Sequence, residues 1–214
     1  MDKDLLQQAV RLATLDPTRP RQANVRRAVS SVYYALFHLL VDEATRVQIG
    51  AQHNQASFRQ VLGRAFVHGV MKEACKSFGG GSLKKGVAKG LPASFAIPIE
   101  IRELAAMFVD LQDHRHAADY DLTERFQRSD VLLLIRDVER RIQDFNNLAS
   151  STKKRFFLAC VGLEGPGEPL RARQPAGGSR AIPLSHDPMP GVSGRALAIA
   201  AGGQSSLTPT PLAC

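Results

Sequence analysis

The chain has 214 residues, of which 44% are hydrophobic and 22% are charged, so it is long enough to bury the core of one domain without disulfides. Its 28 Lys and Arg against 20 Asp and Glu give a formal net charge of +8, which favours a polyanionic partner. The three widely spaced cysteines indicate neither a disulfide framework nor a metal site, and no apolar run approaches the roughly 20 residues of a membrane span. We therefore expect a cytoplasmic protein with no metal, no cofactor and no membrane partner.

Apolar residues recur every three or four positions through most of the first 161 residues, which is typical of amphipathic helices. This spacing predicts helices over residues 4–15, 22–47, 56–78 and about 99–121. It places Val29, Val32, Leu36 and Leu40 on the apolar stripe of the second helix, and Phe58 and Val61 on the apolar face of the third. The prolines of residues 16–20 end the first helix, and a loop with three lysines over residues 83–98 follows the third. Ser129 is expected to cap a last long helix that continues to about Val161.

From Gly162 onward the composition changes to Gly, Pro, Ala, Ser and Arg, with no sustained period. No segment shows the alternation of a strand. The predicted fold is therefore all-α, an antiparallel bundle of four to five helices over residues 1–161 with a disordered C-terminal tail over residues 162–214. That tail holds four Arg against three acidic residues, so nearly all of the positive charge belongs to the predicted bundle.

Residues 113–121, Asp-His-Arg-His-Ala-Ala-Asp-Tyr-Asp, gather charged and polar side chains at the end of an apolar helix. Arg115 follows Leu111 by four positions, which places it close to the buried stripe of that helix. Asp119 follows Arg115 by four, a spacing suited either to an internal ion pair or to a functional site. A functional site in this chain is expected here.

Two segments together resemble signatures of one family. Residues 26–38, Arg-Arg-Ala-Val-Ser-Ser-Val-Tyr-Tyr-Ala-Leu-Phe-His, are similar to the helix Arg-x-Ala-x-Ser-x-x-Tyr-Tyr-Ala-x-Phe-His of the HEPN superfamily. Residues 115–121, Arg-His-Ala-Ala-Asp-Tyr-Asp, are similar to its Arg-x-x-Ala-Asp-Tyr signature. The resemblance covers about residues 1–160 and implies an all-α domain that forms a homodimer.

The family includes ribonuclease toxins and effectors, and also partners of small nucleotidyltransferases in toxin–antitoxin pairs. The resemblance thus implies a protein that binds RNA or a nucleotide near Arg115, in a toxin–antitoxin or defence-type module. In family ribonucleases, four to six residues separate the Arg from a His, whereas four residues after Arg115 are followed here by Tyr120 and six by Leu122. Metal-independent RNA cleavage and a non-catalytic role beside a nucleotidyltransferase both remain open. In the second case Tyr120 is a candidate acceptor of a nucleotide.

Candidate catalytic residues are Arg115, His116, Asp119 and Tyr120. Arg115 could hold a phosphate through two donors, and His116 could supply the group that titrates near neutral pH. Candidate residues for binding RNA or nucleotide are Arg27, Tyr34, His38 and Arg115. For the aromatic residues and His38 the alternative is a structural role in the core, and for Arg115 it is the ion pair with Asp119.

Overall fold

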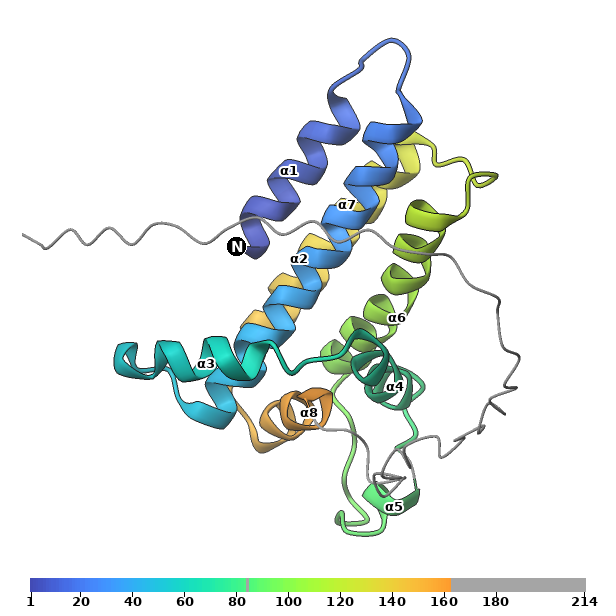
Figure 1. Cartoon of the computed structure of the whole chain (residues 1–214). Helices are drawn as coiled ribbons and strands as arrows, with labels where there is room; N and C mark the ends of the chain where they lie inside the picture. Colours follow the sequence, from blue (N-terminus) through green and yellow to red (C-terminus); the bar gives the residue numbers. More distant parts are fainter. Residues whose placement is uncertain (84, 163–214) are drawn as a thin grey trace, which may run out of the picture. The chain divides into compact units, whose positions relative to one another are not determined.

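In the computed structural model, which describes residues 1–83 and 85–162, the described chain is all-α and has no strand (Figure 1). The predicted helical bundle is confirmed. The helices are α1 (Asp2–Thr14), α2 (Gln22–Ile49), the 3-10 turn η1 (His53–Gln55), α3 (Ala56–Gly63), α4 (His68–Gly79), α5 (Lys85–Ala88), α6 (Ile99–Tyr120), α7 (Arg128–Asn147) and α8 (Thr152–Gly162). Of the predicted tail, only Gly162 lies among the described residues.

Helix α2 is the central helix, and α1, α6 and α7 run alongside it (Figure 1). Its apolar residues lie on several sides of the helix, because it has helical neighbours on several sides. Val29, Val32, Leu36 and Leu40 have no exposed surface. These are residues of the stripe that the sequence predicted. The helix therefore provides a rigid support for the polar residues on its remaining, less covered side.

The predicted helix over residues 56–78 is two helices, because the chain bends between α3 and α4. Phe66, in the connecting segment, is buried in the core. Phe58 and Val61, which the sequence placed in the core, are 65% and 67% exposed on α3. Helix α4 instead buries Met71, Cys75 and Phe78. The bend places His68 at the start of α4.

The predicted long helix over residues 129–161 is also interrupted, between α7 and α8. Lys154 explains the break, because its buried Nζ donates hydrogen bonds to the main-chain oxygens of Phe145 (2.7 Å) and Leu148 (3.3 Å) at the end of α7. Ser129 does not cap α7. The N-cap is Gln127, and the Ser129 hydroxyl donates to Asp130 Oδ1 at 3.0 Å.

Within residues 1–83 and 85–162, none of the helices has the length and apolar character that a membrane crossing requires.

Candidate functional site

The site lies where the last turns of α6 meet the side of α2. Arg26 on α2 donates hydrogen bonds to the main-chain oxygens of Ala118 at 2.9 Å and Asp121 at 2.8 Å. It also donates to the oxygen of Glu124, just beyond the helix. The last carbonyl groups of a helix have no partner in the helix itself, and Arg26 supplies one from a neighbouring element. The polar stretch is therefore held against α2 rather than frayed into solvent.

Asp119 joins this end of α6 to both α2 and Arg115. Its Oδ1 accepts a 2.7 Å hydrogen bond from the Ser30 hydroxyl, and its Oδ2 lies 2.7 Å from Arg115 Nε. The Nε–H bond does not point at that oxygen, so the contact is an ion pair without a hydrogen bond. Arg115 Nε is thus a buried donor that has no hydrogen-bond acceptor among the described residues.

The Arg115 guanidinium is surrounded by phenol rings. Its Nη2 donates to Tyr34 Oη at 3.3 Å, and its Cζ lies 5.7 Å from the Tyr34 ring centroid. The Tyr33 and Tyr120 ring centroids are 6.0 and 5.9 Å from the same Cζ. Contacts at these distances hold a cation against aromatic faces. The side chain is 20% exposed, so its charge is partly shielded from water but still reaches the surface.

His68, from the start of α4, completes this cluster. Its Nδ1 lies 2.5 Å from the hydroxyl of the fully buried Tyr33, and its ring centroid is 4.2 Å from that of Phe37. Burial lowers the pKa of His68, and the positive charge of Arg115 and the nearby basic His38 lower it further. Burial raises the pKa of Tyr33, so its phenol keeps its proton. A neutral imidazole therefore stands beside a permanent cation.

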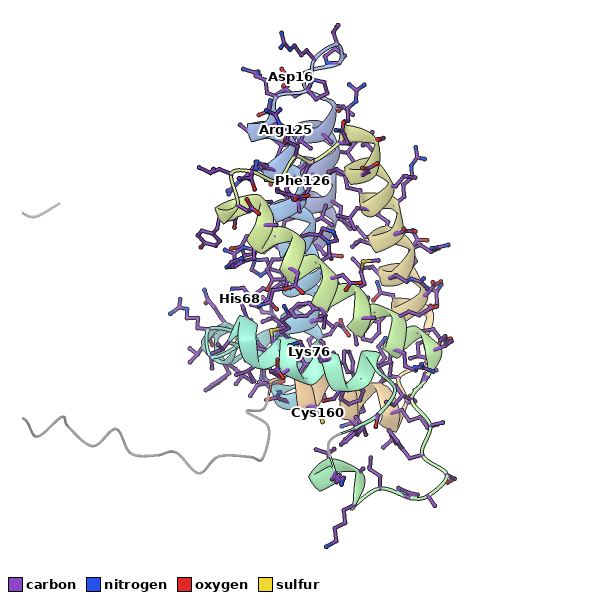
Figure 2. All side chains as sticks on the ribbon, turned by 90° about the vertical axis from the view of Figure 1, so that its right-hand side faces the viewer. Asp16, His68, Lys76, Arg125, Phe126 and Cys160 are labelled. Carbon is purple, nitrogen blue, oxygen red and sulfur yellow. The ribbon has the colours of Figure 1, made fainter. Side chains whose placement is uncertain are left out.

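Figure 2 shows His68 and Lys76 on α4, well away from Arg125 and Phe126.

His38 borders the cluster on α2. Its ring centroid is 6.2 Å from that of Tyr34 and 5.4 Å from that of Phe37. Burial lowers the pKa of His38 as well. Because Tyr34 also contacts Arg115 and His68, four side chains from three helices share one surface.

Most of the candidate residues from the sequence are connected by these contacts, and two are not. Arg115, Asp119, Tyr120, Tyr34 and His38 belong to the cluster. His116 is exposed, and its one ring contact is with Tyr120, with the two centroids 4.9 Å apart. Arg27 is exposed on α2 and takes part in none of these contacts.

His68 is the residue that sequence reasoning missed. It shows no spacing relation to residues 113–121, and it reaches Tyr33 only because the chain bends before α4. Gly63 and Gly69 weaken a helix over this region, and that weakness was the one local signal of the bend.

No protein-family model, no curated protein and no solved structure matches the chain.

A cavity of about 550 Å³ lies among residues 81–102, where Arg102 and Phe95 line it, and none of the candidate residues does. In the described part of the chain, no three His, Cys, Asp or Glu side chains are grouped as metal ligands would be.

Proposed function

We propose that the protein is a HEPN-like protein that binds RNA or a nucleotide, in a toxin–antitoxin or defence-type module, with a phosphate of the ligand at Arg115. The observation that carries the proposal is how the Arg115 side chain is held and how much of it is exposed. Its guanidinium is held by Asp119 and Tyr34, and the side chain is still 20% exposed, so the terminal N–H groups that these two residues do not occupy can reach a ligand. A phosphate oxygen is an acceptor that suits a guanidinium in both charge and shape.

The partly buried position of Arg115 strengthens this argument. An arginine is charged at every physiological pH, and its attraction for an anion is less screened where water is partly excluded. Asp119 lies 2.7 Å from Nε and fixes the guanidinium from that side, so a ligand would bind through the terminal nitrogens.

The surroundings of Arg115 suit a ribonucleotide better than a free phosphate ion. Tyr120 is 65% exposed and lies against the guanidinium, so its ring is open to stack on a base. The net charge of +8, carried almost wholly by the first 161 residues, attracts the rest of an RNA strand. A homodimer, which the family resemblance implies, would bring a second Arg115 to the same strand.

The proposal is tested by fluorescence anisotropy with a labelled single-stranded RNA. Arg115→Ala should weaken binding about tenfold or more, because the phosphate loses its charge-assisted partner. Arg125→Ala is the matched control, since Arg125 is exposed and lies far from His68 along the bundle (Figure 2). Equal loss in both variants would indicate attraction by net charge only and would contradict a site at Arg115.

A second candidate function is a non-catalytic partnership with a small nucleotidyltransferase that modifies Tyr120. The specific observation is the accessibility of this phenol: Tyr120 is 65% exposed, whereas Tyr33 is fully buried and Tyr34 is partly buried. The adjacent Arg115 could hold the phosphate of the transferred nucleotide. Co-expression with such an enzyme, followed by intact-mass measurement, should show added nucleotide that Tyr120→Phe abolishes. An unchanged mass would exclude this candidate.

A further inference from the structure

We propose that the cavity beside the first turn of α6 binds a small molecule that carries one carboxylate group on an apolar body. The cavity has a volume of about 550 Å³, within the roughly 300–1,000 Å³ of pockets that hold small molecules. None of the residues that line it belongs to the Arg115 cluster. The inference therefore goes beyond the proposed function and does not depend on RNA binding.

The connector between α4 and α6 provides most of the cavity walls. Short turns fold this connector, as where the main-chain N–H of Phe95 donates to the oxygen of Pro92 at 2.8 Å. Leu83 and Ile97, near its two ends, pack against the hydrophobic core. The walls of the cavity therefore rest on the helical bundle.

Phe95, on the apolar side of the cavity, is held in place by α8. The ring centroids of Phe95 and Phe156 are 5.7 Å apart, with the ring planes at 83°. The Nζ atom of Lys153 lies 5.7 Å from the centroid of the same Phe95 ring. Three aliphatic side chains also line the cavity, and they are Leu83, Leu91 and Ile97. The hydrocarbon part of a ligand would leave water for this apolar surface.

Arg102 supplies the charge of the cavity. Among the described residues that line the cavity, it is the only one with a charged side chain. Its guanidinium has neither an ion pair nor a hydrogen bond with any described residue. A Cβ atom at Gly81 would stand 3.2 Å from Arg102 Cζ, and Gly81 has a φ of +72°. Glycine is therefore required twice at position 81, by the backbone conformation and by the close approach of the guanidinium.

The charges around the cavity favour an anion. Residues 80–99 contain three lysines and no Asp or Glu. Glu103, one residue beyond Arg102, does not line the cavity and is paired with Arg141 of α7. An anion that enters the cavity therefore meets an unpaired arginine and no carboxylate from the lining residues.

A carboxylate fits these groups better than a phosphate does. A guanidinium binds both oxygens of a carboxylate through parallel N–H groups, and its single charge balances that of the carboxylate. The Ser82 hydroxyl, which also lines the cavity, is a further donor. A phosphate monoester carries nearly two negative charges at neutral pH, so part of its charge would stay unbalanced against the apolar walls.

The test is isothermal titration calorimetry of the full-length protein with octanoate, 1-octanol and octyl phosphate. Octanoate should bind saturably, and both other compounds should bind more weakly, the alcohol about tenfold or more. Arg102→Gln should weaken octanoate binding about tenfold or more and leave the binding of octanol unchanged. Arg11→Gln is the matched control, because Arg11 is an exposed arginine on α1, which lies well away from α5 (Figure 1). It should bind octanoate as the wild-type protein does.

A series from hexanoate to octanoate tests the apolar walls with the wild-type protein alone, so it decides the question even if Arg102→Gln no longer folds. Affinity should rise about fourfold with each added methylene group, because each one is buried. Absence of saturable octanoate binding, affinity that does not change with chain length, or tighter binding of octanol or octyl phosphate would each overturn the inference. Equal effects of Arg102→Gln and Arg11→Gln would overturn it as well. All of these outcomes leave RNA binding at Arg115 untouched.

Discussion

The hydroxyl of Ser30 on α2 donates a 2.7 Å hydrogen bond to Oδ1 of Asp119 on α6. The same carboxylate lies 2.7 Å from Arg115 Nε through its other oxygen. Ser30 is buried, so this hydrogen bond forms where water competes little. Through Asp119, the packing of α2 against α6 therefore fixes the position of the Arg115 guanidinium, where we place the phosphate.

Ser30→Ala should lower the free energy of unfolding by about 1 kcal/mol, because Asp119 loses a partly buried partner. Chemical denaturation measures this value. Ser77→Ala serves as the control, since the Ser77 hydroxyl bonds only to a carbonyl of its own helix, and it should change stability by about 0.5 kcal/mol or less. Equal effects of the two substitutions would show that the bond between α2 and α6 contributes nothing of its own.

Arg26→Gln should lower the free energy of unfolding by about 2 kcal/mol, because several main-chain oxygens at the end of α6 lose a charged donor. Amide hydrogen exchange should also speed up in the last turn of α6 and in the turn that follows. Arg27→Gln removes the same charge one residue away, where the side chain is exposed, and should leave both properties unchanged. Unaltered exchange in Arg26→Gln would contradict the role of Arg26 as the cap of α6.

His68 should make the protein less stable in acid. Burial lowers its pKa in the folded state below the ordinary value of 6.5, so the unfolded chain binds the proton first as the pH falls. The free energy of unfolding should therefore decline from about pH 6.5 downward until the folded-state pKa has been passed. His68→Gln should flatten that decline, whereas His53→Gln should not. A wild-type stability that stays constant between pH 7 and pH 5 would refute this expectation.

Lys154→Met should destabilise the fold by about 1–2 kcal/mol, because the main-chain oxygens of Phe145 and Leu148 lose their donor. Burying the Lys154 ammonium costs free energy, which is also why its pKa is lowered. Methionine avoids that cost, so part of the lost stability is recovered. The comparison is Lys153→Met, whose ammonium lies 5.7 Å from the Phe95 ring and caps no helix. A melting temperature lowered equally by both changes would exclude the capping role.

The sequence predicted those parts of the fold that depend on local periodicity. Val29, Val32, Leu36 and Leu40 on α2 form a buried stripe as expected. The same reasoning was wrong for Phe58 and Val61, which are spaced like core residues but lie exposed on α3. Periodicity indicates that a helix has an apolar face, and it does not indicate whether another helix covers that face.

In the candidate site, too, contacts within one helix could be predicted from the sequence, and contacts between helices could not. Arg115 and Asp119 pair because residues four apart on a helix are neighbours, so their contact could be predicted. The contacts of Arg115 with Tyr34 and of Asp119 with Ser30 join two helices, and no spacing within either helix predicts them. His68 reaches Tyr33 through a bend that Phe66 stabilises by packing into the core, and no local pattern specified that contact.

The central claim is that an RNA phosphate binds at Arg115 beside His68, and nuclear magnetic resonance of the histidine ring protons tests it most directly. The probe is a DNA strand that contains one ribonucleotide, whose 2′-hydroxyl is methylated so that it cannot react. When this strand saturates the protein, the pKa of His68 should rise above its value in the free protein, because a nearby phosphate anion favours the imidazolium. Saturated binding with no change in the titration of His68 would contradict the claim.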